Sequence, residues 1–189
     1  MAESGLDSVK KTRDVEVEWH AFELRPGGKF YGTPEQEAEY RSRIHERHEQ
    51  MRTYARQHFD LEMGEGPWAV NSRPALEGMH FASAHGREEA YHRACFAAHW
   101  HEGRRLDDLA TLVEIARSAG LDGDDFRAAI ETSRHQFDVE MDLMMAREIG
   151  VNAVPAFIFG NRYLVSGAQP ARVLEQVVDR CVAEGLEEK

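Results

Sequence analysis

The stretch VNAVPAFIFGNRYLVSGAQ, from Val151 to Gln169, decides the fold of this chain. A short apolar run ends at Phe159, Gly160 and Asn161 follow, and a second β-prone run extends from Tyr163 to Val165. Gly and Asn between two such runs favour a tight turn, because both accept the left-handed backbone that the turn requires. The stretch therefore predicts an antiparallel hairpin.

Two prolines and a glycine bound this hairpin. Pro155 has no N–H and is unsuited to a central strand, so we expect it at the first position of the first strand or in a turn before it. Gly167 ends the second strand. Pro170 then favours the first turn of a closing helix, where its fixed φ is already helical.

Before the hairpin, the N-terminal residues predict a short helix and then a strand. Residues 2–12 place Leu6 and Val9 at helical spacing. From Val15 to Ala21, apolar residues alternate with Glu16, Glu18 and His20, which is the period of a strand with one buried face. Because its outward residues are charged, we expect an edge strand.

The middle of the chain predicts helices. Thr33 as N-cap and Pro34 at the first helical position begin a long, charged helix that extends to about Phe59. Apolar stripes interrupted by glycines follow and predict a small helical domain. We expect one further helix from Phe126 to Ile149, which ends at Gly150 and turns Val139, Leu143 and Ala146 inward.

The hairpin led by Val154-Pro155, the following residues Val165 to Gln169, and the Phe-x-Leu-x-Pro sequence from Phe22 to Pro26 resemble DsbA-family proteins of the FrnE-type branch. The resemblance covers nearly the whole chain. It implies an α/β, thioredoxin-like fold with a large, all-helical insertion domain. Residues 1–32 and 150–189 would form the thioredoxin-like domain, and residues 33–149 the insertion.

The same resemblance implies a site. In the family, the peptide bond before this proline is cis and faces a redox-active Cys-x-x-Cys, so Val154 and Pro155 would bind the substrate. A central strand delivers that motif onto the first helix, and the present sequence begins at that helix. The fold would then be incomplete, and we expect the chain as given to lack the redox motif and to be inactive by itself.

The cysteines present do not replace that motif. Cys95 and Cys181 lie far apart on predicted helices, and neither begins a helix, where the dipole lowers a thiol pKa. We expect both to be buried and inert, so no catalytic residue is assigned. His92, Cys95 and His99 share a helix face, but their spacing is not that of known zinc sites, and no metal site or other cofactor is predicted.

Composition narrows the class of partner. The chain has 189 residues, 42% of them hydrophobic, and a net charge of −11, which disfavours binding to nucleic acid. It contains no apolar run of about 18 residues and no signal-peptide core, so we expect no membrane segment. Two distant cysteines suit a reducing cytoplasm.

Three functions remain open. The first is a thiol–disulfide oxidoreductase acting on a thiol or disulfide substrate protein, or on a small thiol such as glutathione. The second resembles the glutathione-dependent 2-hydroxychromene-2-carboxylate isomerases, which carry a serine where the oxidoreductases carry the first cysteine; Ser4 is the nearby candidate. The third is a non-catalytic peptide-binding module. A homodimer is compatible with each of them.

Overall fold

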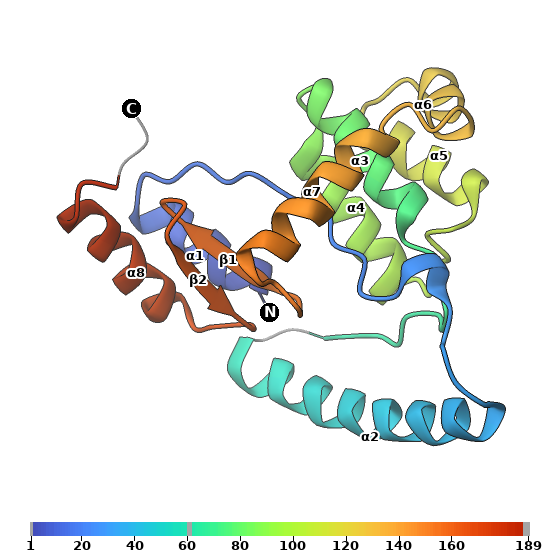
Figure 1. The fold of residues 1–189 in the computed structure, drawn as a ribbon, viewed down its shortest axis with the longest axis horizontal. Helices are drawn as coiled ribbons and strands as arrows, with labels where there is room; N and C mark the ends of the chain where they lie inside the picture. The colour runs from blue at the N-terminus through green and yellow to red at the C-terminus, as the bar shows by residue number, and fades with distance from the viewer. Residues whose placement is uncertain (1, 60–61, 187–189) are drawn as a thin grey trace. The chain divides into compact units, whose positions relative to one another are not determined.

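The computed structural model describes residues 2–59 and 62–186, which contain eight α-helices, one 3-10 turn and a two-stranded sheet (Figure 1). The chain divides into two compact units. Unit 1 comprises Met1–Trp19 and Ala146–Lys189, and unit 2 comprises His20–Met145. The domain boundary expected at residue 32 falls inside unit 2, and the assignment of a thioredoxin-like domain with a helical insertion stays a prediction.

The hairpin in unit 1 confirms the first prediction. Strands β1 (Ala156–Phe159) and β2 (Tyr163–Ser166) are antiparallel, with Phe157 opposite Val165. The turn residues Gly160 and Asn161 both have a φ of 52°, the left-handed conformation that Gly and Asn accept most readily. The Arg162 amide closes the turn on the Phe159 carbonyl at 3.0 Å.

One face of the hairpin packs on the first and last helices of the described chain. These helices are α1 (Ala2–Thr12) and α8 (Ala171–Ala183), which Figure 1 shows beside the hairpin. Their buried core consists of Val9, Leu174 and Val178. The hairpin and its surroundings add Val15, Phe157, Phe159, Val165 and Ala171. Burial of these apolar side chains holds unit 1 together, although its two segments are far apart in sequence.

Polar bonds reinforce the contact between α1 and α8. The Thr12 hydroxyl donates to Glu175 at 2.6 Å. Arg13 donates two hydrogen bonds to the carboxylate of Asp179, at 2.7 and 2.9 Å. This bidentate geometry orients the end of α1, but its groups are exposed, so it contributes little beside the apolar core.

The segment from Val15 to Ala21 corrects the sequence analysis. Its burial alternates as predicted: Val15, Val17 and Trp19 are half-buried, and the residues between them are exposed. However, β1 and β2 are the only strands of the sheet within the described residues. Alternation determines which side chains turn inward, whereas a strand also needs a hydrogen-bonded neighbour. The edge-strand prediction is wrong, and the segment is extended coil.

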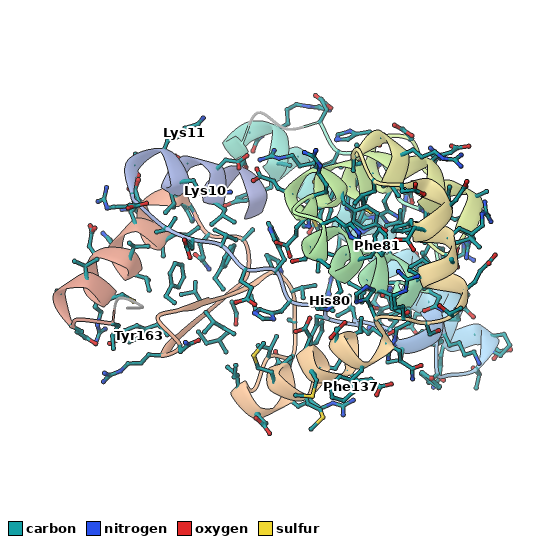
Figure 2. The ribbon with its side chains drawn as sticks, turned by 90° about the horizontal axis from the view of Figure 1, so that it is seen from above. Lys10, Lys11, His80, Phe81, Phe137 and Tyr163 are labelled. Carbon is teal, nitrogen blue, oxygen red and sulfur yellow. The ribbon has the colours of Figure 1, made fainter. Side chains whose placement is uncertain are left out.

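Unit 2 is built around a helical core, as predicted. The helices are α3 (Arg73–Ala84), α4 (Glu88–Trp100), α5 (Leu109–Ser118) and α6 (Gly123–Glu131). Phe81, labelled in Figure 2, is fully buried together with Tyr91, Leu112 and Phe126. The Phe81 and Phe126 rings meet edge to face, with their centroids 5.4 Å apart, an arrangement favoured by the ring quadrupoles.

Gly78 permits this packing. A Cβ atom at residue 78 would lie 2.3 Å from the Tyr91 hydroxyl and 2.7 Å from Cζ of Phe126. Both rings are buried, so neither has room to retreat. The missing side chain therefore lets α3 approach α4 and α6 closely.

The single helix expected from Phe126 to Ile149 is two helices. α6 ends at Glu131, Ser133 has a φ of 48°, and α7 begins at Gln136. The Thr132 hydroxyl donates to the Ala128 carbonyl at 2.7 Å, which is the local side-chain bonding that competes with helix propagation. α7 ends at Ile149 before Gly150, whose φ of 84° confirms the predicted glycine stop.

The long helix α2 (Pro34–Phe59) is also confirmed. It begins with a capping box: the Gln36 amide donates to the Thr33 hydroxyl at 3.3 Å, and the Thr33 amide donates to the Gln36 side chain at 2.9 Å. Tyr40 then packs between Phe30 and Trp68. Within the described residues, no helix combines the length and apolar character that a bilayer span requires.

Replacement of Gly78 by Ala tests the packing of α3. Helix propensity alone would favour alanine by about 1 kcal/mol, but the clash with two buried rings should cost more. We expect a net loss of about 1–3 kcal/mol in the free energy of unfolding, measured by urea denaturation. Gly123→Ala is the matched control, because the three atoms nearest to a Cβ there belong to the flexible Arg117 side chain, and it should change stability little. A Gly78→Ala protein as stable as wild type would contradict this account.

Candidate functional site

Val154 and Pro155 lie in unit 1 immediately before β1. Their peptide bond is cis. Val154 is 50% exposed. The Pro155 carbonyl accepts a hydrogen bond from the Gly167 amide at 2.8 Å, so the proline is tied to the end of β2 while the residue before it stays accessible.

The backbone around Val154 is suited to bind an extended peptide. The β1–β2 ladder begins at Ala156, paired with Ser166, and so does not use the N–H and C=O of Val154. Among the described residues, β1 has β2 as its one strand partner. A strand edge of this kind can accept an added peptide through main-chain hydrogen bonds.

The two cysteines lie where a thiol is a poor nucleophile. Both are free and buried, Cys95 within α4 and Cys181 within α8. Burial raises the pKa of Cys95 to about 12, although a hydrogen bond with Tyr91 opposes the rise. Burial also raises the pKa of Cys181. Because the thiolate is the reactive form, the sequence prediction of two inert thiols agrees with this environment.

The face of α4 that carries His92, Cys95 and His99 is covered by other parts of the chain. His92 is buried beside Cys95, and burial lowers its pKa to about 4. His99 is enclosed by the chain at Gly66, where an added Cβ would lie 2.3 Å from its Nε2. Across the part of the chain that the structure describes, no three His, Cys, Asp or Glu side chains converge as metal ligands.

Ser4 lies in the first turn of α1. The first four N–H groups of a helix have no partner within it and favour negative charge. A serine there is near donors that can stabilise an anionic sulfur or oxygen. Gly5, beside it, allows α1 to approach the Gln169 carbonyl, which would lie 3.0 Å from an added Cβ.

Sequence reasoning missed a polar cluster in unit 2. The Asp142 carboxylate, only 10% exposed, accepts hydrogen bonds from His20 Nδ1 at 2.8 Å, His80 Nε2 at 2.9 Å and the Ala21 amide at 2.6 Å. A carboxylate only accepts, so both imidazoles donate. Burial by itself would raise the pKa of Asp142, but these three bonds outweigh it and hold the pKa far below its ordinary value of 3.8.

One sequence signal could have found this cluster. α7 was expected to turn Val139, Leu143 and Ala146 inward. The structure buries Val139, Asp142 and Ala146, and leaves Leu143 half-buried. A charged residue on the buried face of a helix needs partners. Its partners lie at residues 20, 21 and 80, too far apart in sequence for any spacing rule.

A second missed group is Glu77, one turn before His80 on α3. Glu77 is 5% exposed, and its Oε2 has no hydrogen-bond partner within the described residues. Burial raises its pKa above the ordinary 4.5, and the charge of Arg73 only partly opposes this. Arg73 is instead held by Glu23 through two hydrogen bonds, at 2.9 and 3.1 Å.

Glu77 should make stability depend on pH. Its pKa is higher in the folded than in the unfolded chain, so its favourable contribution is complete below pH 4.5 and is lost as pH rises through the folded-state pKa. At neutral pH we expect Glu77→Gln to be more stable than wild type by about 1 kcal/mol, as measured by chemical denaturation. The two proteins should converge near pH 4.5. Glu148→Gln, an exposed change near the end of α7, is the control, and an advantage of Glu77→Gln that does not vary with pH would exclude the explanation.

Comparison with known proteins agrees with these features. The family model described as a DSBA-like thioredoxin domain matches residues 1–179. An uncharacterised Bacillus subtilis protein, YwbO, is 28% identical over 184 residues, which cover 94% of this chain and 88% of that protein.

Two solved structures are similar to this chain. A probable DsbA oxidoreductase from Streptomyces coelicolor is 31% identical with a TM-score of 0.59, and the match covers 63% of this chain and 52% of that one. The chain therefore matches about half the length of the Streptomyces protein. A 2-hydroxychromene-2-carboxylate isomerase matches with a TM-score of 0.72 over 99% of this chain and 92% of its own. At 18% identity, it shows the fold alone.

The match over residues 1–179, together with a proline-led hairpin packed on the first and last helices, gives the fold as α/β and thioredoxin-like with a large helical content. The chain belongs to the DSBA-like thioredoxin domain family.

Proposed function

We propose that this chain is of the DsbA-type, FrnE-like class of thiol–disulfide oxidoreductases, that Val154 and Pro155 are its substrate-docking residues, and that the chain as given is inactive in exchange by itself. The family match over residues 1–179 is the observation that carries the proposal. The similarity to the probable DsbA oxidoreductase of Streptomyces coelicolor supports the same class of reaction. Its substrate would be a protein or small molecule with a thiol or disulfide, such as glutathione.

In thiol–disulfide exchange, the described residues of this chain would serve to bind the substrate. In thiol–disulfide exchange, a thiolate attacks one sulfur of a disulfide, forms a mixed disulfide and releases the other sulfur as a thiolate. Neither Cys95 nor Cys181 suits the attack, because burial raises the pKa of both. What this chain itself contributes is therefore the surface that holds the substrate in an extended conformation.

Docking would use the backbone of Val154. Its N–H and C=O lie beyond the β1–β2 ladder, and the residue is half exposed. A peptide aligned there forms main-chain hydrogen bonds that do not depend on its sequence, whereas the exposed Val154 side chain offers an apolar contact. Such a surface suits an enzyme that accepts many cysteine-containing substrates.

Val154→Pro tests the docking surface, because it removes the N–H and keeps an apolar side chain. The probe is a short fluorescent peptide with a central S-methylcysteine, which cannot react. We expect Val154→Pro to weaken its binding by roughly tenfold, the value of one or two main-chain hydrogen bonds, as measured by fluorescence anisotropy. Val154→Ala keeps the N–H and should bind nearly as wild type does. Equal binding by all three proteins would reject docking through this backbone.

A glutathione-dependent isomerase is the second candidate. The position of Ser4 in the first turn of α1 favours it, because the start of a helix favours negative charge such as that of a bound thiolate. We expect turnover of 2-hydroxychromene-2-carboxylate with glutathione if this candidate is correct, and its loss in Ser4→Ala, followed by absorbance. Ser8→Ala, later on the same helix, is the control. No turnover at micromolar protein would dismiss the isomerase.

These two measurements, together with an assay of thiol–disulfide exchange, identify the third candidate, a non-catalytic peptide-binding module. Such a module binds the S-methylcysteine peptide in a Val154-dependent manner and shows no exchange or isomerase activity. A Cys95→Ser, Cys181→Ser double variant would bind the peptide unchanged, because both thiols are buried.

A further inference from the structure

The chain crosses from one unit to the other at two points in the sequence. The side chain of Asp142 connects the segments at these two points. The first passage is at Trp19–His20 and the second at Met145–Ala146. Asp142 lies on α7 one turn before the second passage. It binds the side chain of His20 and the amide of Ala21, which are the first residues after the first passage.

We propose that Asp142 is a clamp that holds together the two points where the chain leaves unit 2, and that the protonation of His80 sets the strength of this clamp. Asp142 and its partners His20, Ala21 and His80 all belong to unit 2. The proposal is independent of the thiol chemistry above. It concerns how firmly the two connecting segments are anchored.

The geometry excludes an ordinary surface ion pair. Asp142 is on the buried face of α7, and His80, labelled in Figure 2, is only 20% exposed on α3. The Ala21 amide bond, at 2.6 Å, is buried. Residues 20 and 21 lie outside the two strands of the described sheet, and the bonds to Asp142 fix their position on α7.

The strength of the clamp depends on pH because His80 and Asp142 change charge with pH. The hydrogen bond with Asp142 raises the pKa of His80 above its ordinary 6.5, and burial opposes this rise. The charges of Asp142 and Asp138 raise the pKa of His80 further, whereas the charge of His20 lowers it. The His80 contribution is complete below pH 6.5 and is lost as pH rises through its folded-state pKa. The Asp142 contribution is complete above pH 3.8 and is lost only as pH falls far below that value. The clamp is therefore strongest between pH 3.8 and 6.5.

Neighbouring charged groups do not replace these partners. Asp138, on α7, is bonded to His135 at 2.7 Å. Arg73, on α3, is bonded to Glu23. The electrostatic partners of Glu77 are Arg73, His135 and Glu140 rather than Asp142. Neutral imidazoles can still donate to Asp142, so deprotonation weakens the clamp without abolishing it.

The hydrogen-exchange protection factor of the Ala21 amide directly measures how firmly Asp142 holds that amide. We expect its protection factor to fall at least about tenfold in Asp142→Asn, whereas Glu140→Asn, an exposed change on the same helix, leaves it unchanged. In wild type, the protection factor should also fall between about pH 6 and about pH 9, on either side of the ordinary histidine range. Chymotrypsin cleavage after Trp19 should accelerate in parallel with the loss of protection in Asp142→Asn.

If Asp142→Asn does not fold, the variant His80→Gln provides a second test of the proposal. It retains a donor but not the positive charge, so Ala21 protection should become nearly independent of pH across that range. Amides in the buried part of α5 report global unfolding and should show the same stability in each folded variant. Ala21 protection that matches wild type in Asp142→Asn, or that does not respond to pH in wild type, would overturn the proposal.

Discussion

The burial of Leu174, Val9 and Val178 against the inner face of the hairpin is the contact on which unit 1 depends. It joins α1 to α8, although the whole of unit 2 separates them in sequence. The hairpin alone, with two strands of four residues, would be marginal in water. Phe157, Phe159 and Val165 give it an apolar face, and the two helices cover that face. The position of Val154 and Pro155 follows from this packing.

The chain belongs to a thioredoxin-like family, but its two cysteines are not placed for thiol chemistry. The family model covers residues 1–179, and Val154, the proposed docking residue, is exposed just before β1. The thiols, by contrast, are placed where a thiol is least reactive: burial holds the pKa of Cys95 at about 12. A nucleophilic thiolate needs a helix N-terminus or a nearby cation, and neither cysteine begins a helix. The proposal for this chain therefore concerns the binding of a substrate and not the covalent step.

Unit 2 combines an apolar core with an unusual amount of buried charge. Phe81, Tyr91 and Phe126 pack at a density that leaves no room for a side chain at Gly78. Beside this core, Asp142 is fully bonded, whereas Glu77 keeps an oxygen without a partner in the described chain. The two carboxyl groups have opposite pKa directions for that reason: hydrogen bonds to the charged form lower one, and burial without them raises the other.

Local chemistry was enough to predict the elements that depend on few residues. The Gly160-Asn161 turn, the Thr33 cap of α2 and the Gly150 stop of α7 were all readable from sequence, because each is specified by the backbone preferences of adjacent residues. Tertiary structure decided the rest. Whether Val15 to Ala21 formed a strand depended on a neighbour that alternation cannot reveal, and the division of α6 from α7 had no Gly or Pro to mark it. The bonds from Asp142 to residues 20, 21 and 80 arose only when three distant segments met, since burial of a charge selects its partners in space and not in sequence.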